Sequence, residues 1–144
     1  GIYTPPLHDA LPISIFTAHS IPSESLELGD PYAEEFDKTI KKLVERVQPR
    51  YWFKAYQSQG MIPVPWLGPT VEAVLDKIAK QGSKTVLIIP VGFVCDHVEI
   101  LFDIDIEFNK YAKERKLSLH RTESLNLSPT FIEALASLTW ENLV

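Results

Sequence analysis

A histidine and four carboxylates follow an apolar run near the middle of this 144-residue chain. The apolar run covers residues 85–90 and ends at a glycine turn. The polar residues after it include Asp96, His97, Glu99, Asp103 and Glu107. Polar groups at the carboxyl end of a buried strand lie where open α/β sheets bind their ligands. Imidazole and carboxylate groups together suit a divalent metal or proton transfer, and spacing alone does not choose between the two.

Three of the carboxylates, Glu99, Asp103 and Glu107, recur every four residues on a helix that we expect over residues 96–115. Each therefore lies ~6 Å further along the helix axis. The ordinary explanation is a solvent-exposed acidic face, with the helix dipole stabilising Glu99. No lysine or arginine occurs between Glu99 and Lys110, so the carboxylates repel one another. That repulsion favours a face that handles cations or protons, and both explanations stay open.

Two histidines and an aspartate near these carboxylates have competing roles. His97 falls on the apolar stripe of the same predicted helix, so we expect it to pack in the core rather than bind a metal. The residues of this stripe are His97, Leu101, Ile104, Phe108 and Tyr111. Asp96 is a candidate N-cap. His19 ends an apolar run over residues 13–18 and is either a hydrogen-bonded structural residue or a ligand.

Apolar runs alternate along the chain with helical patterns. We expect strands at 13–18, 51–56, 85–90 and 117–121, and helices at 31–47, 70–80, 96–115 and 129–138. This alternation predicts an α/β fold, a three-layer doubly wound parallel sheet of about four strands with right-handed crossovers. His19, Gln57-Ser58, Gly92-Phe93 and Thr122-Glu123 all follow strand ends, so they should gather along one edge of the sheet. We predict the site at that edge.

Composition excludes several classes of protein. The net charge is −5 and basic residues form no stripe, which gives no reason to expect a nucleic-acid partner. No apolar run approaches the ~20 residues that span a bilayer. The single cysteine, Cys95, forms no internal disulfide, and we expect it to be a small buried core residue. A cytoplasmic location fits this cysteine usage.

The first 13 residues have no helical or strand period and lack the features of a signal peptide. Residues 7–13 are similar to the translation of a common sequencing-adapter oligonucleotide. We therefore expect residues 1–13 to be a non-native or unstructured leader, assign His8 no role, and place the folded domain at 14–144. We expect this domain to be the second part of a longer protein.

An aromatic residue, Trp66, lies in a stiff loop between two prolines and a glycine. Its structural role would be to cover an edge of the core. Its functional role would be to stack on a flat apolar ligand.

Five segments of the chain, in register, resemble the carboxyl-terminal half of ferrochelatases. They are Thr17-Ala18-His19-Ser20-Ile21-Pro22 with Gly29-Asp30-Pro31-Tyr32, Gln57-Ser58, Pro65-Trp66-Leu67-Gly68-Pro69, Gly92-Phe93 through Asp96-His97-Val98-Glu99, and Arg121-Thr122-Glu123-Ser124-Leu125-Asn126. The resemblance covers nearly all of residues 14–138. It implies one of two similar α/β halves that enclose a cleft in which Fe²⁺ is inserted into a porphyrin during haem biosynthesis.

The resemblance also assigns roles to residues. It implies that His19 and Glu99 bind the metal or remove pyrrole protons, and that Asp103 and Glu107 belong to an acidic row that conducts metal or protons. It implies that the porphyrin pocket is lined or supported by Ser20, Trp66, Phe93, Asp96 and His97. Fe²⁺ is then a substrate, and the porphyrin is protoporphyrin IX or coproporphyrin III.

The chain departs from the family pattern in two respects. The amino-terminal half, with the other wall of the cleft, is absent, so we expect weak or no activity from this fragment alone. The cysteine-rich tail that holds an iron–sulfur cluster in some members is also missing, so we expect no such cluster. A peripheral contact with the inner membrane is left open. The alternatives are a sirohydrochlorin chelatase for Co²⁺ or Fe²⁺ and a non-catalytic α/β module that binds a small ligand or metal.

Overall fold

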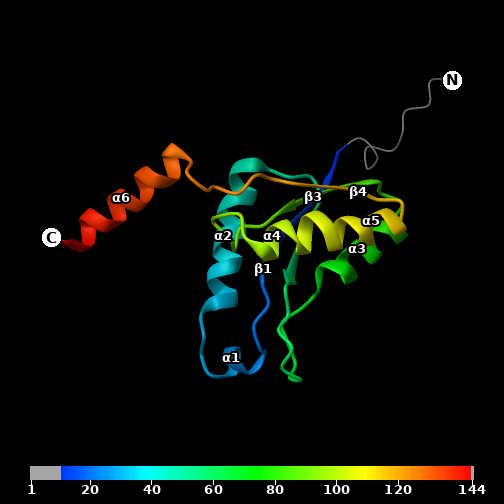
Figure 1. Cartoon of the computed structure of the whole chain (residues 1–144), viewed down its shortest axis with the longest axis horizontal. Coiled ribbons are helices and arrows are strands. Elements are labelled where there is room, and N and C mark those ends of the chain that lie inside the picture. Colours follow the sequence, from blue (N-terminus) through cyan, green and yellow to red (C-terminus); the bar gives the residue numbers. More distant parts are fainter. Residues whose placement is uncertain (1–10, 144) are drawn as a thin grey trace.

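The computed structural model of the chain describes residues 11–143 and shows one parallel sheet of four strands flanked by helices (Figure 1). The strands are β1 (Ile13–His19), β2 (Trp52–Gln57), β3 (Thr85–Ile89) and β4 (Ser118–Arg121). Their order in the sheet is β2-β1-β3-β4, and every pair of neighbours is parallel. All four strands lie where the sequence predicts them.

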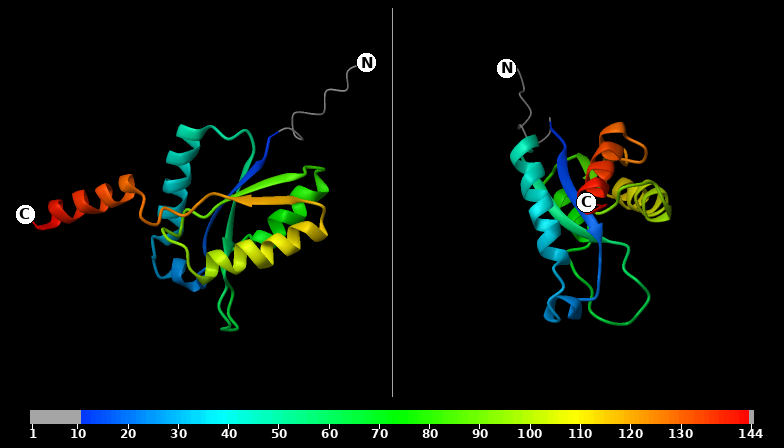
Figure 2. Two further views of the ribbon diagram at one scale, coloured as in Figure 1. Left: turned by 45° about the horizontal axis from the view of Figure 1, so that its top comes forward. Right: turned by 90° about the vertical axis from the view of Figure 1, so that its left-hand side faces the viewer.

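Helices cover both faces of this sheet, as the two views in Figure 2 show. The helical segments are α1 (Glu24–Glu27), α2 (Tyr32–Val47), α3 (Val71–Lys80), α4 (Val98–Leu101), the π-helical η1 (Asp103–Phe108), α5 (Asn109–Glu114) and α6 (Pro129–Leu143). Helix α2 packs on one face, and α3 and the α4–η1–α5 segment pack on the other. The predicted three-layer doubly wound architecture is therefore confirmed.

The central strand β1 shows why the sequence folds in this way. Its first six residues are all buried, because a strand covered on both faces needs apolar or small side chains at successive positions. Ile13 and Ile15 point to the α3 side, while Phe16 and Ala18 point to the α2 side. The two faces of this apolar strand thus contribute to two separate cores, one on each side of the sheet.

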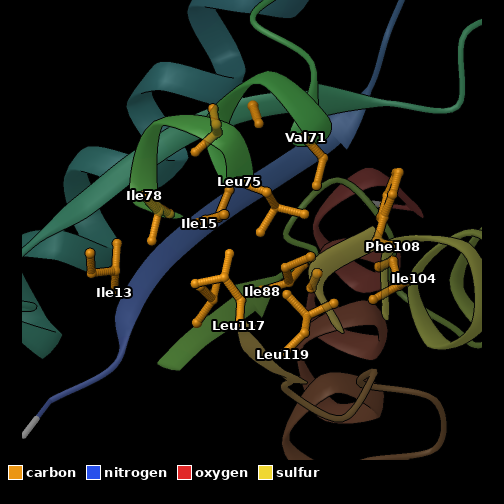
Figure 3. Close-up of a cluster of buried hydrophobic side chains, with 14 of the residues drawn as sticks. Ile13, Ile15, Val71, Leu75, Ile78, Ile88, Ile104, Phe108, Leu117 and Leu119 are labelled. Carbon is orange, nitrogen blue, oxygen red and sulfur yellow. The ribbon is translucent and has the colours of Figure 1, made fainter. Parts of the chain in front are cut away.

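The larger core lies between the sheet and the helices α3 and α4–η1–α5 (Figure 3). Leu75 and Ile78 of α3, Ile88 of β3 and Ile104 of η1 are at most 1% exposed. Helix and strand side chains at these positions interdigitate and fix the carboxyl ends of β1 and β3 relative to the segment that carries the carboxylates.

The third predicted helix differs from the expectation in its start and in its geometry. It begins at Val98 rather than Asp96, and it widens into a π-helical stretch at Asp103–Phe108. A π-helical turn holds one extra residue, which shifts every later side chain around the axis. The buried residues are consequently Ile100, Ile104, Phe108 and Ala112.

The predicted stripe of this helix is therefore wrong at two of its five positions. Ile104 and Phe108 are buried and Tyr111 is partly buried against the same core, but Leu101 is 48% exposed and His97 is only partly buried. His97 precedes the helix instead of packing in the core.

Two further differences concern helices at the periphery. The segment expected to be loop after β1 contains the single-turn helix α1. Helix α6 continues to Leu143, beyond the predicted end near Leu138, and projects away from the sheet with none of its described residues buried (Figure 1).

The predicted leader lies mostly outside the described residues, because residues 1–10 are not among them. Its last residue, Ile13, is the first residue of β1 and is 4% exposed in the core. The folded domain therefore includes Ile13.

Candidate functional site

The carboxyl ends of β1 and β3 meet at the point where the chain connections diverge. The chain leaves β1 toward α2 on one face and leaves β3 toward α4 on the other. Such a topological switch point is where open α/β sheets bind ligands. His19 is the last residue of β1, and the segment from Gly92 to Glu99 follows β3. The predicted gathering of these residues at one edge of the sheet is what the structure shows.

His19 and Glu99 form a hydrogen-bonded pair at this point. The Nε2 atom of His19 lies 3.0 Å from Oε1 of Glu99, although 80 residues separate them in the chain. The two side chains are 33% and 36% exposed, so the pair is half-buried but open to a ligand.

The hydrogen bond of the other ring nitrogen of His19 determines the tautomer of the ring. Its Nδ1 bonds to the carbonyl oxygen of Ser20, and a carbonyl only accepts, so Nδ1 carries a proton. A neutral ring then presents a lone pair at Nε2 toward the Glu99 carboxyl group. A hydrogen bond between these two atoms therefore needs a proton on one of them, and without it a nitrogen and an oxygen lone pair face the same point.

The first turn of α4 places Glu99. His97 is the N-cap of this helix, and its Nδ1 accepts a hydrogen bond of 3.1 Å from the backbone N–H of Glu99. The expectation that Asp96 caps the helix is therefore wrong. Because Nδ1 of His97 accepts here, its neutral ring carries the proton on Nε2.

Three rings line this edge in sequence. Phe93 lies between His19 and His97, with ring centroids 6.4 Å from the first and 5.0 Å from the second, both tilted. Two of the predicted pocket residues, Phe93 and His97, are thus beside the predicted catalytic pair. Together they form a rigid aromatic surface next to the nitrogen and oxygen of the pair.

A close approach of backbone brings the loop after β3 onto β1. The N–H of Gly92 donates to the carbonyl of Thr17 at 3.1 Å. A Cβ atom on Gly92 would lie 2.7 Å from both Cα and Cβ of Ala18. Only glycine fits at this contact, which sets the distance between Phe93 and His19.

Asp96 lies in the same loop, and its carboxylate bonds to the segment after β4. It accepts hydrogen bonds from Ser124 Oγ at 2.7 Å and from Asn126 Nδ2 at 3.2 Å, and Arg121 Nη1 lies 3.6 Å away. Arg121 also forms a bidentate pair with Asp105. Asp96 therefore ties the loop that carries Phe93 to the end of β4.

These hydrogen bonds predict a pH dependence of stability. Bonds from Ser124 and Asn126 hold the pKa of the Asp96 carboxyl group below its usual 3.8. A carboxyl group whose pKa is lower in the folded state stabilises the fold above its usual pKa, and this contribution is lost as the pH falls through the folded value. We expect the free energy of unfolding of D96N to fall less than that of the wild type between roughly pH 4 and pH 2. Urea unfolding at a series of pH values measures this, and parallel profiles would contradict it.

Of the predicted acidic row, Asp103 and Glu107 lie together, but Glu99 is not in line with them. Ser58 donates a short hydrogen bond to the Asp103 carboxylate, and Glu107 is exposed. Both carboxylates line a polar hollow of about 320 Å³ at the end of β2, together with Gln57, Ser58 and Glu72. The π-helical turn begins at Asp103, so Asp103 and Glu107 do not continue the spacing of an ideal α-helix from Glu99.

The side chains of two predicted pocket residues form hydrogen bonds with backbone carbonyl groups of the chain. Ser20 is fully buried and its hydroxyl donates to the carbonyl of Leu67 at 2.8 Å. Trp66 is partly buried, its Nε1 donates to the carbonyl of Ile62 at 3.1 Å, and its ring packs on Gly60. Ser20 ties the loop between β2 and α3 to the segment after β1, and the Trp66 side chain braces that loop from within. Cys95, expected to be buried, is exposed.

Residues to which the sequence assigned no individual role also meet at the site. Gln57 is 2% exposed and its Nε2 donates to the carbonyl of Glu99 at 2.9 Å. Glu72 adds a third carboxylate to the polar hollow, and Asp105 pairs with Arg121. The position of Gln57 after a predicted strand was the available signal. Nothing in the sequence brings Glu72, on another helix, to Asp103.

Within residues 11–143, no group of three or more His, Cys, Asp or Glu side chains is arranged to hold a metal ion. His19 and Glu99 form a pair and belong to no such group. No helix of the described part of the chain is long and apolar enough to cross a membrane.

The fold and the site together define a chelatase-like α/β domain with its candidate site at the switch point of a parallel sheet. A family model described as Ferrochelatase matches residues 9–143. The chain belongs to the ferrochelatase family.

Individual relatives agree with this assignment. The chain is 45% identical over 124 residues to a protein named Ferrochelatase from Herpetosiphon aurantiacus, covering 86% of this chain and 41% of that protein. It is 41% identical over 144 aligned positions to a protein of the same name from Acidobacterium capsulatum, covering 90% and 44%. The chain thus spans less than half the length of these curated relatives.

A solved structure shares the fold. It is titled as a putative cobalamin (vitamin B12) biosynthesis CbiX protein from Marinobacter aquaeolei VT8. The TM-score is 0.57 at 17% identity, and the match covers 91% of this chain and 96% of that one. A likeness at this identity establishes the fold alone.

Proposed function

We propose that the site inserts Fe²⁺ into a porphyrin, with this chain serving as the carboxyl-terminal half of a ferrochelatase. The observation that supports this most directly is the 3.0 Å contact between His19 Nε2 and Glu99 Oε1 at the switch point. Membership of the family supports a chelatase enzyme, and the pair supplies the groups that such a reaction needs.

The proton balance of the reaction matches the pair. A free-base porphyrin that takes up Fe²⁺ releases two pyrrole protons, so the site needs a base and a route for protons away from it. With no proton between them, His19 Nε2 or Glu99 Oε1 accepts one from a pyrrole nitrogen. Ser58 and Asp103 lie on the side toward the polar hollow, which is open to solvent and gives the proton an exit.

In this proposal Fe²⁺ is a substrate, so its ligands must release it to the porphyrin. One imidazole nitrogen and one carboxylate oxygen bind Fe²⁺ less tightly than thiolates would. The bond from His19 Nδ1 to the Ser20 carbonyl is the arrangement that orients metal-binding histidines. The other coordination positions of Fe²⁺ stay free for water and then for the porphyrin nitrogens.

The rings beside the pair provide a surface for the macrocycle. Phe93 and His97 are fixed by their contacts with each other and with His19. A rigid wall of this kind favours a bent porphyrin whose nitrogens face the metal. In this proposal the opposite wall comes from the amino-terminal half, which accounts for the share of the relatives that this chain does not span.

The location and partners belong to the same proposal. We place the protein in the cytoplasm, with peripheral contact at the inner membrane left open, and assign it no iron–sulfur cluster and no nucleic acid. The porphyrin is protoporphyrin IX or coproporphyrin III, since the sequence likeness is to ferrochelatases.

The test is to join this chain to the amino-terminal half of the Herpetosiphon aurantiacus relative. Insertion of Fe²⁺ or Zn²⁺ is followed by the change in porphyrin absorption, with protoporphyrin, coproporphyrin and sirohydrochlorin offered separately. We expect turnover of one of the two porphyrins by the joined protein and little by the 144-residue chain alone. Activity with sirohydrochlorin only would contradict the proposed substrate. Full activity of the chain alone would contradict the need for a second wall.

A further inference from the structure

One buried residue contacts the segments of both members of the catalytic pair, and nothing in the sequence predicts a role for its side chain. Gln57 is the last residue of β2, where it is the Cα partner of His19 in the parallel register. Its carbonyl accepts a hydrogen bond of 2.7 Å from the N–H of Ser20. Its side-chain Nε2 donates at 2.9 Å to the carbonyl of Glu99.

From these contacts we propose that Gln57 is a positioning residue for the reaction, one that sets the separation of His19 Nε2 and Glu99 Oε1. This inference rests on the proposed function, because positioning has a purpose only if the pair acts on metal or protons. It goes beyond that function by naming a residue that touches neither substrate.

The placement of Glu99 needs such support. Helix α4 has four residues and passes at once into the π-helical stretch that starts at Asp103, so its own hydrogen bonds hold Glu99 over a single turn. His97 fixes the N–H of Glu99 and Gln57 fixes its carbonyl. The two bonds clamp the peptide groups on both sides of the Glu99 Cα atom, which leaves its carboxylate little freedom apart from side-chain rotation.

The orientation of the Gln57 amide follows from its partners. The Glu99 carbonyl only accepts, so the amide nitrogen must face it. The same nitrogen lies 3.3 Å from Ser58 Oγ, which in turn donates to Asp103. The amide oxygen is left buried with no hydrogen-bond partner among the described residues. An unpaired buried oxygen of this kind destabilises the fold, and a side chain that served only to fill space would gain by losing it.

A substitution that removes this unpaired oxygen distinguishes a positioning role of Gln57 from a merely structural one. A methionine at position 57 has nearly the same length, removes the unpaired oxygen and also removes the donor to Glu99. If Gln57 only fills space, Q57M is more stable than the wild type, because it loses the unpaired oxygen, and it leaves the pair unchanged. If Gln57 positions Glu99, Q57M also loses the bond to the Glu99 carbonyl, so its stability changes little and the pair is loosened.

The experiment uses Co²⁺ as a probe and the 144-residue chain as it is. Co²⁺ is titrated into the wild type, H19A, E99Q, Q57M and the control Q81M while its visible d–d absorption is recorded, and urea unfolding of each variant is measured alongside. Gln81 is the matched control because it is exposed and lies between the end of α3 and the start of β3, at the opposite edge of the sheet from the pair. We expect Q57M to bind Co²⁺ roughly 10- to 100-fold more weakly with an altered d–d spectrum, and Q81M to match the wild type.

The outcomes separate this inference from the proposed function. Loss of Co²⁺ binding in H19A and E99Q with wild-type binding in Q57M overturns the positioning role and leaves the proposed function standing. Wild-type binding in H19A and E99Q overturns the proposed function.

A second measurement keeps the inference testable if Q57M does not fold or if the proposed function fails. In isotope-labelled wild type, the hydrogen bond from Gln57 Nε2 to the Glu99 carbonyl gives a through-bond coupling in the NMR spectrum. Its presence, with slow exchange of the Gln57 amide protons, supports the positioning role. Its absence overturns that role whatever the metal titrations show.

Discussion

The variant Glu99→Gln, in the joined two-half protein, is expected to lower the rate of metal insertion on the order of 10²- to 10⁴-fold while porphyrin binding stays near that of the wild type. The change replaces one carboxylate oxygen by an amide and keeps the shape of the side chain. Under the proposed function, it removes the anionic ligand for the dication and the base for the pyrrole proton in one step.

The geometry explains why the fold should tolerate this change. The new amide group at position 99 can donate to the lone pair at His19 Nε2, because Nδ1 already carries the proton of the neutral ring. The pair therefore stays hydrogen-bonded but no longer holds a transferable proton. Two bonds to the main chain of residue 99 are unaffected: its N–H still donates to His97 Nδ1, and its carbonyl still accepts from Gln57 Nε2.

The measurements are the initial rate of Zn²⁺ insertion and the quenching of porphyrin fluorescence on binding. Glu45→Gln on the exposed side of α2 is the control, since it removes the same charge far from the pair. An insertion rate of E99Q within a few-fold of the wild type would show that the carboxylate belongs to a solvent-exposed acidic face, which was the ordinary explanation of the sequence.

The sequence predicts the order of strands and helices because that order depends on local patterns. Short apolar runs between amphipathic segments leave few arrangements other than a parallel sheet with helices on both faces. The carboxyl edge of the sheet follows from this topology, and with it the meeting of His19 and Glu99. The meeting of these two residues could therefore be predicted from the sequence.

The details of the site were not predictable in the same way, because they depend on contacts between distant segments. The stripe of the third helix is misplaced because nothing in the local pattern marks the extra residue of the π-helical turn at Asp103–Phe108. Gln57 looks like an ordinary polar residue at a strand end, and its bond to Glu99 exists only after β2 and α4 have packed together. The exposure of Cys95 likewise depends on how the loop after β3 folds back.

Gly92→Ala is the second variant for which we expect a large effect. A Cβ atom at this position would lie 2.7 Å from backbone Cα of Ala18, and backbone cannot rotate away as a side chain does. The loop after β3 must therefore move off β1. We expect a loss of about 1–3 kcal/mol in the free energy of unfolding, as for other overpacked sites. We also expect a loss of about 10²-fold in insertion rate, since small misplacements of reacting groups cost that much.

Two further variants assign the effect of Gly92→Ala to the contact with β1. Gly68→Ala is the control, because its new Cβ would meet nothing closer than 3.7 Å. Adding Ala18→Gly to Gly92→Ala removes the Cβ–Cβ overlap but keeps the overlap with the Cα atom, so we expect a partial rescue of both stability and rate. Urea unfolding and insertion kinetics of the wild type, the two single variants and the double variant form a double-mutant cycle. Additive effects of the two substitutions would contradict the contact, whereas a positive coupling would show that the close approach of Gly92 to Ala18 holds Phe93 beside His19 and keeps the site assembled.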